Sequence, residues 1–384
     1  MTCSFESLLY SCRRLAPMIL AISALGGIGL AEETCPRPVR MIFDTDIGND
    51  VDDAMALAVI HALADRGECE LLAVTVTKDN RYAAPCTDLI NTFYGRPDVP
   101  IGTVRDGMAP EDGKYIRHLA TATDDGELRY PHDLKSGADA PEAVGLLRKT
   151  LAGEPDGSVV LVQVGFSTNL SRLLDSKADE HSPLDGKSLV KRKVNLLSIM
   201  AGAFTAELAA KRFCEYNVKI DVPNARKVIH DWPTPVVFSG WEIGHAVQYP
   251  PRSIQDDYGY VEHHPIAHAY DLYRGRTNEQ PTYDLTSVLY AVRPERDYFN
   301  LSAPGRVIVE DDGFVRFQPE ENGPHRYLIA TPQQVIRTRE ALMMLTSQPP
   351  ARSSARHGSV VQISFVAAKR HPGRMRSAAA TNEM

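Results

Sequence analysis

Residues 39–64 read VRMIFDTDIGNDVDDAMALAVIHALA, and this stretch decides the fold class. Residues 39–43 are a short apolar run that ends in acidic residues, which is typical of a buried strand. Residues 51–64 carry Met55, Val59 and Ala62 at helical spacing, so we expect a helix there. A strand, a sharp turn and a helix in this order begin a βαβ unit.

The same alternation continues along the chain. Strands are expected at residues 71–77, 100–103, 158–164, 194–200 and 235–239, with helices at 85–94, 141–151, from 168, at 224–231 and at 286–292. This order predicts an α/β fold with an open, mostly parallel sheet flanked by helices on both faces, a Rossmann-like three-layer arrangement. Ligands in such folds bind beyond the carboxyl ends of the strands.

Outside this alternation the pattern is less regular. Residues 306–317 predict a β-hairpin around Asp312-Gly313, and Thr331-Pro332 predicts the start of a final helix that ends near residue 345. Residues 105–138 are polar and lack periodicity. Long segments of this kind are usually functional loops or disordered.

The two ends of the chain differ from the middle in composition. Residues 1–31 combine a basic start, an apolar stretch and small residues before Glu32, which predicts a signal peptide and an exported protein, periplasmic or secreted. A retained membrane anchor and a misassigned start codon are the alternatives. Residues 39–348 are expected to form the α/β domain, and residues 349–384 a disordered basic tail. No membrane contact is expected of the mature form, and the net charge of -7 argues against nucleic acid as a partner.

The turn after the first strand is strongly acidic. Asp44, Asp46, Asp50, Asp52 and Asp53 lie within ten residues, and their mutual repulsion is costly unless a cation binds. Oxygen-only ligands select a hard ion, Ca²⁺ or Mg²⁺. A solvated acidic loop that caps the next helix is one alternative. A phosphatase with an aspartate nucleophile is another, although Ile47-Gly48 after Asp46 departs from that signature.

The motif also indicates a family. Asp44-Thr45-Asp46-x-Gly, followed by Asp52-Asp53-Ala54, resembles the signature of the inosine/uridine-preferring nucleoside hydrolases. The resemblance extends from about residue 39 to residue 294. Its further landmarks are Asn80, the turn at residues 165–169, Glu215-Tyr216-Asn217 and Asp284.

The resemblance implies a calcium-dependent hydrolase that cleaves the N-glycosidic bond of a ribonucleoside or related riboside, as in purine or pyrimidine salvage. It implies that Asp46, Asp53, the carbonyl of Val164 and Asp284 hold Ca²⁺, and that Asp46 activates a water on the ion. By the same resemblance, the ribose would be bound by Asp52, Asn80, Glu215 and Asn217. The sequence leaves open whether the chain forms a homo-oligomer.

Three features depart from the family pattern. The acidic motif contains two additional residues, so Asp50 is a carboxylate without an assigned role. Tyr283 stands where well-known members have the histidine thought to protonate the leaving base, which makes Tyr283 the candidate catalytic acid. Ala209 replaces an expected asparagine. These departures keep a second hypothesis open, a non-catalytic calcium-dependent protein that binds a sugar or nucleoside.

Overall fold

The computed structural model describes residues 37–351. The predicted signal peptide and the predicted tail from residue 352 onward lie outside the described residues. No helix within residues 37–351 is long and apolar enough to cross a membrane.

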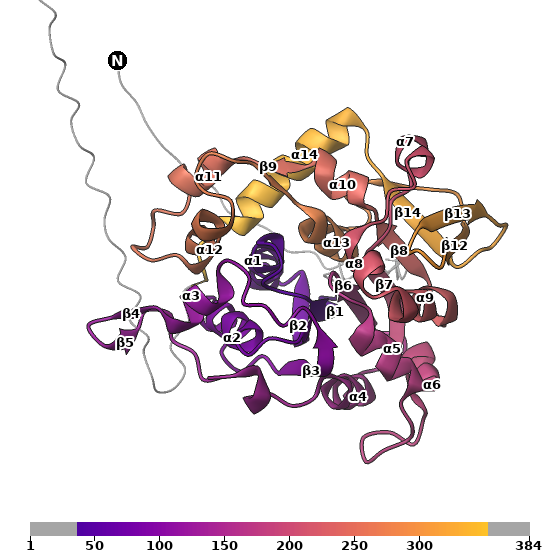
Figure 1. Ribbon diagram of the computed structural model, residues 1–384, viewed down its shortest axis with the longest axis horizontal. Coiled ribbons are helices and arrows are strands. Elements are labelled where there is room, and N and C mark those ends of the chain that lie inside the picture. The colour runs from indigo at the N-terminus through magenta and orange to yellow at the C-terminus, as the bar shows by residue number, and fades with distance from the viewer. Residues whose placement is uncertain (1–36, 352–384) are drawn as a thin grey trace, which may run out of the picture. The chain divides into compact units, whose positions relative to one another are not determined.

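A sheet of ten strands forms the centre of the described chain (Figure 1). Its order is β13-β12-β14-β8-β7-β6-β1-β2-β3, with β11 paired to β14. The run from β14 to β3 is parallel throughout, and the β12–β13 hairpin is antiparallel at one edge. The strands are β1 (Val39–Thr45), β2 (Cys69–Lys78), β3 (Ile101–Met108), β6 (Val159–Gln163), β7 (Val194–Met200), β8 (Val236–Ser239), β11 (Asn300–Leu301), β12 (Gly305–Val309), β13 (Val315–Pro319) and β14 (His325–Ile329).

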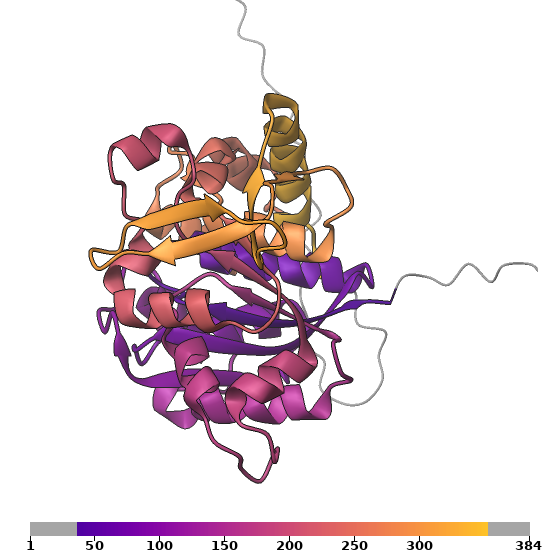
Figure 2. The ribbon, with the colours of Figure 1, turned by 90° about the vertical axis from the view of Figure 1, so that its right-hand side faces the viewer.

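Helices cover both faces of this sheet (Figures 1 and 2). Side chains alternate along β1, so that Met41 and Phe43 enter one hydrophobic core while Ile42 enters the other. The first core packs against α1 (Asp52–Asp65), α2 (Ala83–Phe93), α12 (Pro265–Tyr273), α13 (Tyr283–Val292) and α14 (Pro332–Thr346). The second packs against α4 (Ala143–Gly153), α5 (Thr168–Asp175), α6 (Gly186–Lys193) and α9 (Val222–Asp231). The predicted three-layer α/β fold is confirmed.

The structure adds elements that periodicity did not predict. β14 lies parallel to β8 and separates it from the β12–β13 hairpin. The segment 105–138 is not one long loop, because β3 continues to Met108 and is followed by α3 (Ile116–Thr121) and the short hairpin β4–β5 (Thr123–Asp124, Glu127–Leu128). Short helices that the sequence left as connections are α7 (Ala206–Ala210), α8 (Tyr216–Ile220), α10 (Trp241–Ala246) and α11 (Pro251–Asp256), and β9 (Gln248–Tyr249) pairs with β10 (Gln280–Pro281).

Candidate active site

A cavity of about 460 Å³ opens beyond the carboxyl ends of β1, β6 and β7. Acidic side chains line part of its wall and aromatic side chains another part. Its lining residues are Asp46, Gly48, Asn49, Asp50, Glu111, Gly113, Lys114, Val164, Met200, Glu215, Tyr216, Asn217, Trp241, Tyr273, Tyr283 and Asp284. The position agrees with the general rule for ligand sites in open α/β sheets.

Asp44 anchors the acidic turn from behind the cavity. Its Oδ1 accepts hydrogen bonds from the hydroxyl of Thr75 and from Nδ2 of Asn169, at 2.9 Å for the latter. Burial nevertheless raises the pKa of Asp44 to about 7. Asp44 is fully buried and does not line the cavity, so we infer that it stabilises the acidic turn.

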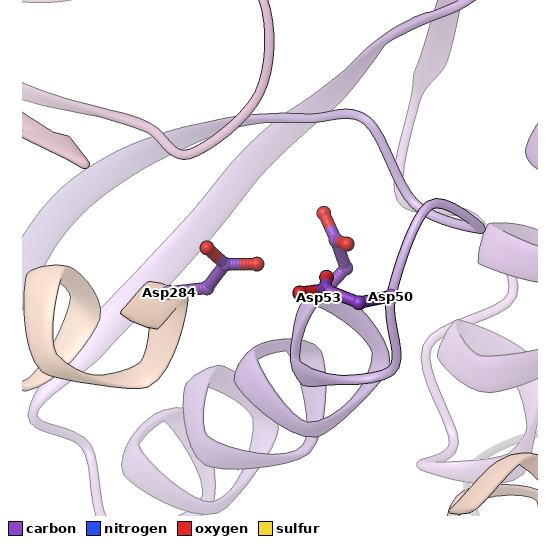
Figure 3. A group of neighbouring side chains, drawn as sticks. All are labelled: Asp50, Asp53 and Asp284. Atoms are coloured by element: carbon purple, nitrogen blue, oxygen red, sulfur yellow. The ribbon is translucent and has the colours of Figure 1, made fainter. Parts of the chain in front are cut away.

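Three carboxylates, from the acidic turn, from α1 and from α13, come together beside the cavity. Oxygen atoms of Asp50, Asp53 and Asp284 all lie within 4.8 Å of one another. Figure 3 shows Asp284 on the first turn of α13 facing Asp50 and Asp53 at the start of α1. Burial, and then the neighbouring carboxylates, raise the pKa of Asp53 and of Asp284 well above the usual range.

This group fits a hard divalent cation. Oδ1 of Asp53 accepts a hydrogen bond from the Thr45 hydroxyl, while Oδ2 is buried and has no hydrogen-bond partner. An unpaired buried carboxylate oxygen beside two further carboxylates is costly without a positive charge. The group does not include Asp46, which lines the same cavity.

Asp52 occupies a different environment. Its carboxylate accepts hydrogen bonds from Nε2 of Gln280 at 3.3 Å and from the main-chain N–H of Asp284 at 3.2 Å. It is fully buried and does not line the cavity, whereas Asp50 does. The structure therefore places Asp50, and not Asp52, where a ligand in the cavity would meet a carboxylate.

Asp46 lies at the cavity wall within a short polar chain. Nδ2 of Asn49 donates a hydrogen bond to Oδ2 of Asp46, and Nζ of Lys78 donates to Oδ1 of Asn49 at 2.6 Å. The Lys78 side chain is fully buried at the end of β2. Burial, and then the charge of Asp50, raise the pKa of Asp46 to about 7. In the sequence, Lys78 belongs to a polar turn after the second strand. Nothing in that turn predicts that Lys78 is linked to Asp46 through Asn49.

Glu215 and Asn217 bring the start of α8 to the cavity. Glu215 caps this helix, because its carboxylate accepts hydrogen bonds from the main-chain N–H of Asn217 at 2.7 Å and of Val218 at 3.2 Å. Burial raises the pKa of Glu215 to about 7. Nδ2 of Asn217 donates to the carbonyl oxygen of Val164 at 2.8 Å, so this carbonyl already has one partner.

Asn80 does not line the cavity. Its Nδ2 donates to the carbonyl of Pro110 at 2.8 Å and to Oδ1 of Asp112 at 3.0 Å, and its Oδ1 accepts from the N–H of Tyr82. These bonds hold residues 109–115, which we call the strap, over the acidic turn. Glu111, Gly113 and Lys114 of the strap line the cavity, and the sequence did not single them out.

The strap lies directly against Gly48. Gly48 has φ +112°, a conformation that L side chains rarely adopt, so the turn requires glycine there. A Cβ added to Gly113, at φ +62°, would lie 2.1 Å from the carbonyl oxygen of Gly48. The two glycines thus allow a close contact between the acidic turn and the strap.

Aromatic side chains complete the wall. The rings of Trp241 and Tyr283 lie 6.2 Å apart at an interplanar angle of 29°, and His245 stacks on Trp241 at 4.1 Å. Lys114 lies over the ring of Tyr273 at 4.7 Å. Burial raises the pKa of Tyr283 above the ordinary tyrosine value. Tyr283 is therefore placed at the cavity but is a weak proton donor.

Comparison with known proteins identifies the family. The model of the inosine-uridine preferring nucleoside hydrolases matches residues 41–339. The chain belongs to this family. It is 25% identical over 211 residues to the inosine-uridine preferring nucleoside hydrolase of Leishmania major, a match that covers 54% of this chain and 62% of the relative. It is 30% identical over 232 residues to the pyrimidine-specific ribonucleoside hydrolase RihA of Klebsiella pneumoniae, covering 56% and 64%.

The chain thus spans less than two thirds of the length of these curated relatives. Solved structures with the same fold include the plant nucleoside hydrolase PpNRh1, with a TM-score of 0.58, 20% identity and coverage of 81% of this chain and 100% of that one. Another is the purine-preferring ribonucleoside hydrolase of Gardnerella vaginalis, with a TM-score of 0.59, 16% identity and coverage of 80% and 98%.

Proposed function

We propose that this nucleoside hydrolase family member hydrolyses the N-glycosidic bond of a ribonucleoside or related riboside and releases ribose and the free base. One observation carries the proposal: Asp46, Asp50 and Asp284 line one cavity with Glu215 and Asn217, beyond the carboxyl ends of the central strands. Family members act on such bonds through an oxocarbenium-like state, and buried carboxylates stabilise positive charge that develops on the sugar.

A divalent ion, for which we propose Ca²⁺, fits the carboxylates at the cavity floor. Asp53 and Asp284 would hold it, with Asp46 and the carbonyl of Val164 as the further ligands that the family resemblance suggests. Bound there, the ion would lower the pKa of water and orient the ribose hydroxyls. The unpaired Oδ2 of Asp53 supports this arrangement, since it is buried and lacks any partner among the described residues.

Asp46 is the proposed general base. It lines the cavity, where its carboxylate can take a proton from a water molecule held beside the sugar. Asn49 holds one of its oxygens through a hydrogen bond, so the other is free to face the attacking water. Burial strengthens the interaction between this carboxylate and the sugar cation.

Glu215 and Asn217 are the proposed contacts to the ribose hydroxyls. Both are buried and both line the cavity. Asp50 faces the same space, whereas Asp52 and Asn80 are bonded to other parts of the protein. We therefore assign to Asp50 the sugar contact that the family motif suggested for Asp52.

The test is a ribose-release assay with purified protein. Incubation with inosine, uridine, adenosine and cytidine in Ca²⁺ should release ribose from at least one of them, and chelation should abolish release. Asp46→Asn should lower kcat by about 100-fold or more, because the base is lost while its shape is kept. Release of no ribose from any riboside would contradict the proposal.

A second function is a calcium-dependent protein that binds a nucleoside or sugar without cleaving it. Tyr283 in place of a histidine favours this candidate. One structure with the same fold, at 15% identity and a TM-score of 0.60, is a type III effector, XopQ, complexed with adenosine diphosphate ribose. A binder would retain nucleoside affinity in the Asp46→Asn variant and show no turnover in the parent protein.

A further inference from the structure

The cavity has an unusual balance of charge for a site that would bind a neutral nucleoside. Five carboxyl groups line it, from Asp46, Asp50, Glu111, Glu215 and Asp284, against one cationic side chain, Lys114. A divalent ion and Lys114 together carry three positive charges, fewer than the five carboxyl groups. The charges of Lys78 and Arg274 also act on Asp46 and Asp50, and Asp52 and Asp53 add two further buried carboxyl groups close by. Carboxyl groups therefore outnumber the positive charges around the cavity.

Electron-rich rings stand in the same wall. Trp241, Tyr216, Tyr273 and Tyr283 all line the cavity. The face of an aromatic ring attracts a cation, and tryptophan does so most strongly. The ring of Tyr273 already holds such a contact, with Nζ of Lys114 4.7 Å from its centroid. The wall that would face a leaving base is therefore suited to a positively charged ring.

A neutral base needs a proton donor beside it when it leaves. Among the described residues that line the cavity there is no histidine, and a tyrosine hydroxyl such as that of Tyr283 is a weak acid at neutral pH. A neutral purine or pyrimidine departs as an anion unless it is protonated. A base that carries a positive charge in the riboside departs as a neutral molecule and needs no proton.

These three observations agree on one class of substrate. We propose that the preferred substrates are ribosides with a cationic base, such as a pyridinium riboside. This inference rests on the proposed function. The bond between C1′ and the ring nitrogen breaks, and its electron pair returns to the ring, which leaves neutral. The oxygen of water bonds to C1′, and the proton of that water passes to Asp46.

Four substrates with matched properties test this. Nicotinamide riboside and 7-methylguanosine have cationic bases, inosine has a neutral base that requires protonation, and 4-nitrophenyl riboside has a neutral group that leaves without it. All are assayed for ribose release by the full chain in Ca²⁺. We expect kcat/KM for both cationic ribosides to exceed that for inosine by about 100-fold, since general acid catalysis typically contributes 10²–10⁴-fold and no histidine of the described chain lines the cavity to supply it.

Charge itself is tested with two ligands that differ by one methyl group on the ring nitrogen. 1-Methylnicotinamide is a permanent cation and nicotinamide is neutral, and both are tested as inhibitors of 4-nitrophenyl riboside hydrolysis. We expect the cation to inhibit at a concentration about fivefold lower or less. In Trp241→Leu, KM for nicotinamide riboside should rise about fivefold, whereas Trp241→Phe, which keeps a ring, should largely preserve it. Thermal unfolding of both variants checks that they fold.

The outcomes separate this inference from the proposed function. Inosine cleaved as fast as the cationic ribosides, or equal inhibition by the two nicotinamides, would overturn the preference and leave the hydrolase intact. His245 is stacked on Trp241. If His245→Gln slows hydrolysis of inosine but not of 4-nitrophenyl riboside, His245 is a proton donor to the leaving base, and the preference is likewise overturned. No release from any of the four, 4-nitrophenyl riboside included, overturns the hydrolase proposal itself.

Discussion

The main-chain N–H of Asp284 donates a hydrogen bond to the carboxylate of Asp52 at 3.2 Å. This bond joins the first turn of α13 to the first turn of α1, although the two residues are 232 positions apart in the chain. It sets the position of Asp284 relative to the acidic turn. Asp52 thereby contributes to the site through the geometry of another carboxylate.

Replacement of Asp52 should show which property of its side chain matters. Asp52→Asn keeps an acceptor for the N–H of Asp284, whereas Asp52→Ala leaves that N–H and Nε2 of Gln280 buried without a partner. We expect the Ala variant to unfold with a free energy about 1–3 kcal/mol lower than the Asn variant. Urea denaturation of both measures the difference, and equal stability would show that the bond contributes nothing.

Removal of Asp53 should affect metal binding directly. Asp53→Asn is expected to lower the affinity for Ca²⁺ by about tenfold or more, because it removes a charged ligand and its unpaired oxygen. The control is Asp221→Asn, since Asp221 is also buried but bonds to Thr168 and Asn224 away from the cavity. Isothermal titration calorimetry with Ca²⁺ gives both affinities. Equal losses in the two variants would argue against a metal site at Asp53.

The buried carboxyls also predict how stability depends on pH. Asp44, Asp46 and Glu215 have pKa values of about 7 in the folded metal-free protein, above the values of 3.8 and 4.5 for free side chains. Between these limits the folded state binds more protons than the unfolded state, so the free energy of unfolding falls as pH rises from about 4 to 7 and then levels off.

We expect a fall of about 2 kcal/mol or more between pH 5 and 7 in the presence of chelator. Saturating Ca²⁺ should flatten the curve, because a nearby positive charge favours the ionised carboxylates. Urea denaturation at several pH values measures both curves. A metal-free protein that gains stability over this range would contradict the burial of these groups.

The contact between the strap and the acidic turn offers a paired glycine test. In Gly113→Ala the new Cβ would meet the carbonyl oxygen of Gly48 at 2.1 Å, whereas in Gly126→Ala it would meet nothing within 4 Å. Both glycines have positive φ, so both variants carry similar backbone strain. We expect kcat/KM to fall about tenfold or more in Gly113→Ala alone, since small displacements of site groups have large effects on rate. Similar activity in the two variants would exclude a functional role for the contact.

Most of the sheet could be predicted from the sequence because buried parallel strands are short apolar runs between helices. β1, β2, β6, β7 and β8 lie where those runs occur. β14 has a mixed sequence, HRYLI, and its place beside β8 depends on a long-range pairing that periodicity does not encode. The acidic motif located the cavity in the same way, through its position at the end of β1.

The individual roles within that motif were harder to predict. Successive residues on a helix differ by about 100° in direction, so the start of α1 at Asp52 decides which carboxylates face the cavity. Asp50, two residues before the helix, lines the cavity, and Asp52 does not. Asn80 follows β2 as the family pattern expects, but its side-chain amide donates hydrogen bonds to the strap. Sequence spacing does not predict this contact.

The strap is anchored at its end by Tyr115, which is buried in the hydrophobic core, and residues 110–112 are held by side chains at the end of β2, through Lys78 to Glu111 and through Asn80 to Pro110 and Asp112. The sheet itself contributes no strand pairing to residues 109–115. The sequence of residues 110–114 can therefore be replaced without altering the central sheet. Such an exchange at residues 110–114 would reshape the rim of the cavity, while the carboxylates of α1 and α13 and the hydrophobic cores would stay as they are.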